Sequence, residues 1–287
     1  MRQLKIPKWT AILLAGIAIL ASCDRGDTSI DLKVIGDKIK FEIGFAGSDN
    51  GLQTRATTDN LFNSTWENGD EIGIFAIRHA NGHTGTLSAS GNYIHNGKLT
   101  YNNGEWMPET QLYYPGGGYE LDFYAYYPYD ATAINPLDIA FKVKTDQYTT
   151  AGFDKSDFMM AAPSLNVTSG QPVDIRFGHS LALLQVEITN NTGVVMNNDF
   201  RVILKNAVTQ ANVNLQTQTV TASGAAAEIT LFPLTATTYR AVVPAGNITL
   251  GVVDFTQPSP NWIFNRYQSA ITLTAGKATR LQITLNN

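Results

Sequence analysis

Short segments in which every second residue is apolar recur along this chain, and clusters of Gly, Asn, Pro and Thr separate them. A period of two places alternate side chains on opposite faces of a β-strand. Residues 181–186 are the one place where a helical turn also fits the pattern. Many short strands at intervals of roughly 8–12 residues favour sandwiches, because parallel sheets need helical crossovers. The sequence therefore predicts an all-β protein.

The clearest alternation covers residues 38–46, KIKFEIGFA. One face of this segment carries four large apolar side chains, those of Ile39, Phe41, Ile43 and Phe45. Lysine and glutamate residues occupy the other face, which is typical of a half-buried strand. Residues 47–63 are rich in Gly, Thr and polar residues, so we expect an exposed loop there, with Arg55 in its middle.

Further strands are expected in the first half of the chain over residues 71–78, 120–127, 139–144 and 158–161, with a hairpin over 92–101 that turns at Asn96-Gly97. In the second half they are expected over residues 173–177, 181–189, 200–206, 211–221, 228–232, 239–243, 248–255, 269–274 and 278–285. Residues 163–172 are rich in turn formers, so we expect a domain boundary there, between residues 37–170 and 171–287.

The N-terminus predicts export. Three cations at Arg2, Lys5 and Lys8 precede an apolar stretch, residues 11–20, that is too short to span a bilayer as a permanent helix. The small pair Ala21-Ser22 before Cys23 matches the lipobox of bacterial lipoproteins, whose cysteine is acylated. We therefore expect residues 1–23 to be a signal peptide, Cys23 to carry lipid, and residues 24–36 to form a tether. The alternative is a plain signal peptide that happens to end in cysteine.

Length and charge limit the remaining choices. Removal of 23 of the 287 residues leaves 264, which suits two sandwiches of about 130 residues better than one. The signal holds three of the 20 basic residues, so 17 basic and 24 acidic residues give the mature chain a charge near −7. This argues against nucleic acid or an anionic membrane surface as the main partner. Cys23 is the only cysteine, so no disulfide is available and the core alone must stabilise the fold.

Several sequence blocks carry a family resemblance. They are Arg55-Ala56-Thr57, residues 66–75 (WENGDEIGIF), residues 123–128 (FYAYYP), residues 158–161 (FMMA), residues 177–182 (FGHSLA) and Ala275-Gly276-Lys277. In this order and spacing the chain resembles the fimbrillin-like family, the lipoprotein precursors of type V pili on Bacteroidota cells. The resemblance extends over nearly the whole mature chain.

The resemblance implies two tandem transthyretin-like β-sandwich domains and assembly by strand exchange. A precursor anchored in the outer membrane by lipid would be cut by an arginine-specific protease in the loop after the first strand. Arg55-Ala56 matches that cut site, and the strand of Ile39, Phe41, Ile43 and Phe45 would be exchanged for a donor strand from another fimbrial subunit. The alternative for Arg55 is an ordinary solvated loop arginine.

The C-terminus leaves the role within the pilus open. Stalk subunits of this family are expected to have C-terminal strands that can leave their own fold, but here the chain ends soon after residues 278–285. Either residues 269–274 and 278–285 form the mobile donor, or they complete the second domain and the protein accepts a strand without giving one. The second case describes a tip subunit.

No set of residues indicates catalysis, a cofactor or a metal. His79 and His83 lie on either side of Ala80-Asn81-Gly82, which reads as a hairpin loop, where a spacing of four does not bring the rings together. His95 and His179 lie next to apolar neighbours and are expected to pack or to form hydrogen bonds. Asp154 and Asp157 are expected to be solvated in a polar loop, with no further ligands at a spacing that suits calcium.

A run of aromatic residues supports a rival function. Residues 113–129 hold seven of the 12 tyrosines, and exposed aromatic rings can stack on sugar faces. A monomeric glycan- or host-binding lipoprotein that stays anchored would share the lipobox and the fold. Alternate aromatic residues in strands more commonly fill a core, so the favoured prediction is a structural and adhesive fimbrial subunit.

Overall fold

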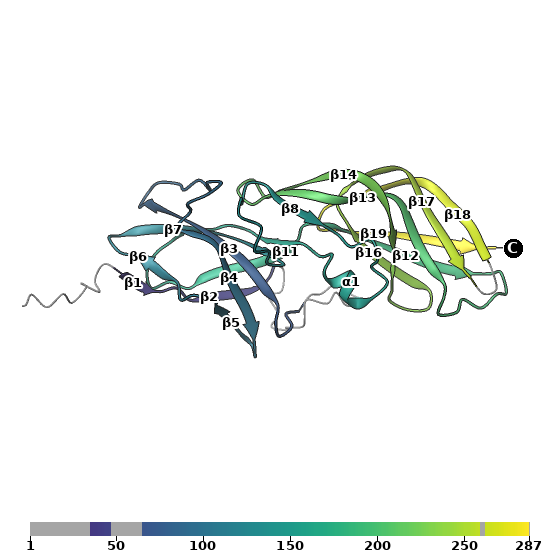
Figure 1. The fold of residues 1–287 in the computed structure, drawn as a ribbon, viewed down its shortest axis with the longest axis horizontal. Coiled ribbons are helices and arrows are strands. Elements are labelled where there is room, and N and C mark those ends of the chain that lie inside the picture. Colours follow the sequence, from purple (N-terminus) through teal and green to yellow (C-terminus); the bar gives the residue numbers. More distant parts are fainter. Residues whose placement is uncertain (1–34, 47–64, 259–261, 287) are drawn as a thin grey trace, which may run out of the picture.

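The computed structural model describes residues 35–46, 65–258 and 262–286. Within these residues the chain forms nineteen strands and one short helix, so the all-β prediction is confirmed. The N-terminal strands gather in one half of an elongated molecule and most of the C-terminal strands gather in the other (Figure 1).

The N-terminal half contains two sheets. A two-stranded sheet pairs β1 (Ile35–Lys38) with β6 (Tyr113–Pro115). An eight-stranded sheet has the order β2-β11-β9-β7-β3-β4-β5, with β10 beside β7. Its strands are β2 (Phe41–Phe45), β3 (Glu71–Ala80), β4 (Ile94–Asn102), β5 (Glu105–Pro108), β7 (Tyr119–Tyr127), β9 (Met159–Ala161), β10 (Ser164–Val167) and β11 (Val173–His179).

The C-terminal half also contains two sheets. One has the order β15-β16-β12-β19, and the other has the order β14-β13-β17-β18 with β8 beside β13. Their strands are β8 (Ile139–Lys142), β12 (Ala182–Asn190), β13 (Arg201–Asn214), β14 (Thr219–Thr230), β15 (Phe232–Pro233), β16 (Thr238–Val243), β17 (Gly246–Gln257), β18 (Trp262–Leu273) and β19 (Ala278–Leu285).

The chain crosses into the C-terminal half before it finishes the N-terminal sheet. Strand β8 pairs with β13, and the helix α1 (Thr150–Asp154) places Phe153 in a stack on Phe232, with ring centroids 5.1 Å apart. The chain then returns for β9, β10 and β11. The division into domains at residue 170 stays a prediction, since the strands on each side of it are interleaved in space.

Strand β7 lies at the centre of the N-terminal half and is buried on both faces. Phe123 and Tyr127 belong to a cluster enclosed by the N-terminal sheet, which also includes Ile72, Ile74 and Phe177. Tyr124 and Tyr126 point into a second cluster that continues through Phe158 and Ile139 into the C-terminal half. The two halves are therefore joined by packed apolar side chains and not by a tether alone.

Three expectations from the sequence differ from the structure. The hairpin expected at Asn96-Gly97 does not form, because β4 runs through both residues and the turn to β5 falls at Asn103-Gly104, where both φ angles are positive. Both sites carry Asn-Gly, so local turn chemistry does not distinguish them. The strand expected over 211–221 is interrupted by a turn at residues 215–218, because its first residues belong to β13 and its last residues to β14. The helical turn considered for 181–186 is strand, because β12 pairs with β16 and β19.

Gly73 provides a direct test of how tightly this sheet packs. It lies in β3 opposite Tyr126 of β7, and a Cβ at this position would overlap the Tyr126 ring. That ring is held in place, because its hydroxyl donates to Asn96 Oδ1 at 2.8 Å and its face stacks on Phe158. Only glycine leaves room for the tyrosine here.

We expect Gly73→Ala to lower the free energy of unfolding by about 2 kcal/mol, the usual cost of an overpacked core position. Gly178→Ala is the matched control, since it is also in a strand of this sheet and no heavy atom lies within 4 Å of its added Cβ. Thermal unfolding of both variants measures the difference. Equal melting temperatures for the two variants would contradict the packing described for Tyr126.

Candidate functional site

The N-terminal strand β2 lies at the edge of the eight-stranded sheet. It runs parallel to β11 over five register pairs, from Phe41 opposite Val173 to Phe45 opposite Phe177. Hydrogen bonds from Val173 N to Lys40 O (2.8 Å) and from Ala46 N to Phe177 O (2.9 Å) extend this pairing at both ends. The other side of β2 has no partner strand among the described residues. This strand therefore joins the sheet through a single neighbour.

The sequence predicted one strand over residues 38–46, but in the structure β1 ends at Lys38 and β2 covers only Phe41–Phe45. Strand β1 pairs with β6, and β2 pairs with β11. The switch takes place at Ile39 and Lys40, where Ile39 N donates to Leu112 O (3.0 Å) and Lys40 O accepts from Val173 N. The change of hydrogen-bonding partner between two sheets explains the break, which the alternation of side chains does not record.

The four apolar residues singled out in this segment all contact one core. Ile39 is buried, and Phe41, Ile43 and Phe45 are half-buried against the cluster that includes Phe177. Phe41 meets Phe123 edge to face with ring centroids 6.0 Å apart, as aromatic pairs prefer. Because these side chains are only partly covered, β2 closes the edge of the core without forming its centre.

Trp66 contacts the same site and follows residues 47–64 in the chain. Its ring stacks on Phe45 at 4.4 Å and meets Phe177 and Trp106 edge to face at 5.4 and 5.0 Å. Thus the points at which the chain leaves β2 and returns to the described structure lie against each other. The predicted processing residues Arg55 and Ala56 are in the intervening segment and lie outside the described residues, as does Cys23.

The last strand, β19, has an equivalent position in the C-terminal half. It is the edge strand of its sheet and runs parallel to β12 over eight register pairs, with Leu285 fully buried. Only Ser180 and Leu181 separate β11 from β12 along the chain. The edge strands β2 and β19 therefore pair with two strands, β11 and β12, that follow each other in the chain. Figure 1 shows β11 leading into the C-terminal half.

An ion pair lies at the junction of β11 and β12. His179 Nδ1 is 2.9 Å from Asp157 Oδ2, and the Asp157 side chain is largely buried. The expectation that Asp157 is solvated is wrong, because the chain returns from α1 and places this carboxylate under the end of β11. Burial opposes the charge on His179, but the charge and the hydrogen bond of Asp157 outweigh it and raise the pKa of His179.

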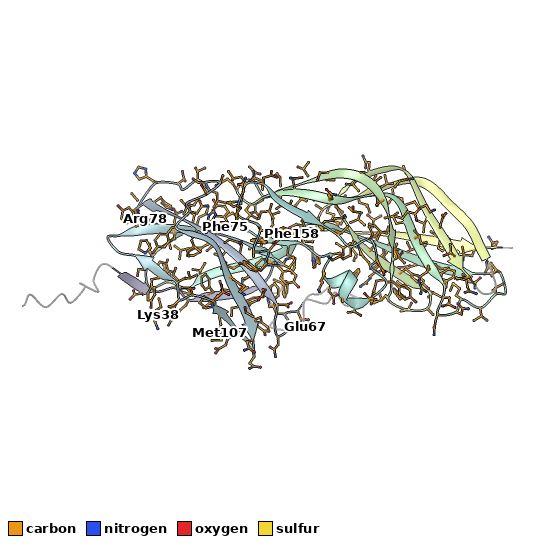
Figure 2. All side chains as sticks on the ribbon, in the orientation of Figure 1. Lys38, Glu67, Phe75, Arg78, Met107 and Phe158 are labelled. Carbon is orange, nitrogen blue, oxygen red and sulfur yellow. The ribbon has the colours of Figure 1, made fainter. Side chains whose placement is uncertain are left out.

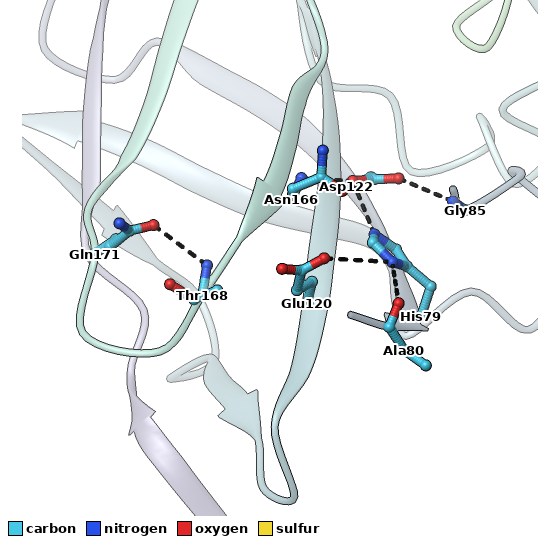
Figure 3. A network of polar contacts seen from close by, with 8 residues as sticks. All are labelled: His79, Ala80, Gly85, Glu120, Asp122, Asn166, Thr168 and Gln171. Carbon is cyan, nitrogen blue, oxygen red and sulfur yellow. Dashed lines mark hydrogen bonds and ion pairs between the residues drawn. The ribbon is translucent and has the colours of Figure 1, made fainter. Parts of the chain in front are cut away.

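A second histidine is buried in a polar network within the N-terminal half (Figure 3). His79 Nε2 lies 3.0 Å from Asp122 Oδ1, and its Nδ1 lies 3.1 Å from Ala80 O. The Asp122 carboxylate also accepts from the backbone N–H groups of Gly85 (3.1 Å) and Asn166 (2.8 Å). One carboxylate thus holds β3, the following loop and β10 together. His79, which the sequence placed beside a hairpin loop, is therefore buried.

Neither histidine belongs to a metal site in the described structure. No group of three or more His, Cys, Asp or Glu side chains in residues 35–46, 65–258 and 262–286 is arranged to hold a metal ion. In the same residues no helix is long and apolar enough to cross a bilayer.

Known proteins resemble this chain in sequence and in fold. The family model described as fimbrillin-like matches residues 54–287. The chain belongs to the fimbrillin-like family. A protein of Bacteroides ovatus, named as a candidate fimbrium tip subunit, Fim1C, is 24% identical over 191 residues, which is 62% of this chain and 33% of that protein. The chain thus spans about a third of the length of this curated relative.

Two solved structures share the fold. One, described as a candidate cell adhesion protein from Bacteroides uniformis, superposes with a TM-score of 0.61 and 22% identity over 86% of this chain and 93% of its own. Another, described in the same way and from Bacteroides ovatus, has a TM-score of 0.62 and 18% identity over 87% of this chain and 91% of its own. At these identities the likeness shows a common fold.

The carboxyl of Asp154, the last residue of α1, gives a pH-dependent prediction. Burial, together with the negative charges of Glu67, Asp157 and Asp70, raises the pKa of Asp154 to about 6. The folded protein therefore keeps a proton that the unfolded chain releases near pH 3.8. Stability from this group is complete at low pH and is lost as the pH rises from about 4 to about 6.

We expect Asp154→Asn to raise stability at pH 7.5 and to leave it unchanged at pH 3.5. The gain should be about 1 kcal/mol, because solvent reaches half of this carboxyl and screens it. Melting temperatures at the two pH values measure it, with Asp199→Asn as the control at an exposed carboxylate. A gain of the same size at both pH values, or in the control, would contradict the assignment.

Proposed function

We propose that this protein is a structural and adhesive subunit of a cell-surface fimbria, a stalk or a tip subunit, assembled when its first strand is removed by proteolysis and replaced by a strand from another subunit. The observation that carries this proposal is the position of β2. It is an edge strand near the N-terminus, held by one neighbour and half-buried on a core that the rest of the sheet encloses.

The energetics support an exchange in place of a simple loss. Removal of residues up to Arg55 would take β1 and β2 together and leave the polar backbone edge of β11 unpaired. It would also uncover the apolar surface beneath Ile39, Phe41, Ile43 and Phe45. Since each fully buried side chain of this size contributes roughly 1.5–3 kcal/mol, the vacant edge would favour a new strand by several kcal/mol.

The remaining structure is able to survive this loss. After β2 leaves, β11 still pairs with β9, and β9 still pairs with β7. The β7 side chains remain packed on both faces, and one of these clusters extends into the C-terminal half. A subunit in this state would hold its shape while exposing an edge that is prone to pair with another chain.

The lipid and the cut at Arg55 belong to one sequence of events in this proposal. Acylated Cys23 would anchor the precursor in the outer membrane. A cut by an arginine-specific protease between Arg55 and Ala56 would remove the anchor and the first strand together. The partners are then the protease, the other fimbrial subunits and a host or glycan receptor.

The choice between stalk and tip depends on β19. In the structure this strand completes its own sheet, with Ile283 and Leu285 buried, which supports a subunit that accepts a strand and gives none. A stalk subunit would instead have to release β18 and β19. The end of β18 meets the start of β19, where Thr279 Oγ1 donates to Thr272 O at 3.0 Å, and the two strands pair with β17 and β12 along most of their length.

Limited digestion of the folded mature protein, residues 24–287, with an arginine-specific protease tests the proposal. We expect one early cut after Arg55 and loss of residues 24–55 by mass spectrometry. A synthetic peptide of residues 38–46 added to the cut protein should raise its melting temperature by several degrees, because the peptide fills the vacant edge. A ladder on an unboiled denaturing gel would identify a stalk subunit, and its absence a tip subunit.

Two matched peptides make the result specific. The peptide with Phe41→Ser and Ile43→Ser should fail to stabilise the cut protein, since it lacks the buried face. The peptide with Lys40→Ser and Glu42→Ser should stabilise it like the parent, since only its solvent face changes. Resistance at Arg55, or equal effects of the two altered peptides, would refute strand exchange and favour a lipoprotein that stays anchored and binds a glycan or a host surface.

A further inference from the structure

Three tyrosines on the N-terminal half are exposed although a buried residue directly follows each of them in sequence. Tyr93, Tyr113 and Tyr119 are 41%, 38% and 40% exposed. Tyr114 and Tyr124, from the same strands as two of them, are 1% and 2% exposed. The core therefore accounts for the buried members of this aromatic run and leaves the exposed members unexplained.

The three exposed rings form one patch around Arg78. Tyr93 directly precedes β4, and its hydroxyl donates to the backbone oxygen of Tyr113 in β6 at 2.8 Å. The Arg78 guanidinium carbon lies 4.8 Å from the centroid of the Tyr119 ring. Ile94 pairs with Ala76 of β3, so Tyr93 lies beside the part of β3 that carries Arg78. We call these four residues the tyrosine patch.

The guanidinium of Arg78 has no polar partner in the described structure. No carboxylate of the described residues lies within 4.0 Å of it, and its recorded neighbour is an aromatic face. Two other arginines have polar partners: the exposed Arg176 pairs with Asp174 at 2.8 Å, and the half-buried Arg201 donates to Asn198 O at 2.7 Å. Arg78 is therefore an exposed positive charge that lies over an aromatic ring, in the N-terminal half of the molecule (Figure 2).

The acidic residues nearest to the patch in sequence do not neutralise it. Glu120 follows Tyr119, but it is 8% exposed and turns toward His79, as does Asp122. The exposed residue paired in register with Tyr113 is a second cation, Lys38 of β1. This surface therefore combines two exposed cations, Arg78 and Lys38, with exposed aromatic rings.

We propose that the tyrosine patch is a binding site for glycans that carry a carboxylate, such as those with hexuronic or sialic acid residues. A fixed guanidinium recognises a carboxylate through two parallel hydrogen bonds. The exposed rings of Tyr93 and Tyr113 offer apolar surface of the kind that packs on the C–H face of a pyranose ring. Tyr119 acts as a positioning residue, because its ring holds Arg78 in place.

The inference gives a ligand class to the adhesive part of the proposed function and rests on that part alone. All four residues lie C-terminal to Arg55, so they stay in the protein whether or not the first strand is removed. Binding can be measured on the uncut protein, without a protease or a second subunit. Failure of this site and failure of strand exchange are therefore separate results.

Titration of residues 24–287 with trigalacturonic acid and 3′-sialyllactose, followed by calorimetry or ligand-observed NMR, tests the site. We expect at least one of these acidic sugars to bind about tenfold or more tightly than neutral lactose. Arg78→Gln should remove that preference, because a hydrogen bond to a charged group contributes about tenfold or more to affinity. Tyr93→Ala should weaken binding of the acidic sugar. Both variants should keep the parent melting temperature within a few degrees, since both residues are exposed.

The control is Arg176→Gln, which removes an exposed arginine from the same half of the molecule and should leave binding unchanged. Hexaglutamate serves as a probe that offers carboxylates without sugar rings. No binding of either acidic sugar, or equal losses in Arg78→Gln and Arg176→Gln, would overturn the proposal. Binding of hexaglutamate as tight as that of the sugars, unaffected by Tyr93→Ala, would also overturn it and indicate a site for acidic peptides.

Discussion

The parallel pairing of β2 with β11 is the contact on which the behaviour of this protein depends. It closes one edge of the N-terminal sheet with a strand that has no other neighbour in the described sheet and that precedes the rest of the described core. A strand in this position satisfies the backbone edge and covers apolar side chains, yet it can leave without cutting through the fold. Few places in an antiparallel protein combine these properties, because most strands are held on both sides.

The molecule repeats this arrangement at its other end. Strand β19 runs parallel to β12 as β2 runs parallel to β11, and β11 and β12 follow each other after Ser180 and Leu181. The His179–Asp157 pair lies at the point where one strand gives way to the next. Since β8 and α1 carry the core of one half into the other, a change at the β2 edge takes place on a body that stays joined by apolar contacts.

Local pattern predicted the strands well and their partners poorly. The alternation in residues 278–285 corresponds to β19 as observed, and residues 120–127 correspond to nearly all of β7. Alternation could not show that the segment from Lys38 to Ala46 changes partner at Ile39, because side-chain period does not record which sheet accepts the hydrogen bonds. For the same reason the placement of β8 beside β13 was not predicted, since it depends on a contact between residues about 70 positions apart.

The site residues divide in the same way. The four apolar side chains of the first strand were recognised from their period. The part played by Trp66 was not, because its stack on Phe45 joins residues that are 21 positions apart in the chain. Asp157 looked solvated from its polar neighbours and is buried because α1 turns the chain back under β11. The exposed tyrosines could not be separated from the buried ones by sequence, since Tyr113 and Tyr114 are adjacent and differ only in the face that they occupy.

A reversible lock on β2 tests the central claim most directly. Glu42 and Asp174 are exposed register partners on β2 and β11, so cysteines at both positions, in a Cys23→Ser background, would join the two strands by a disulfide. A matching lock through Thr100 and Met107 at the opposite edge of the same sheet is the control. Strand exchange predicts that the oxidised β2 lock is still cut at Arg55 but keeps its first strand and does not bind the peptide of residues 38–46, and that reduction restores both release and peptide binding. Peptide binding by the oxidised β2 lock at the same level as by the control would contradict it.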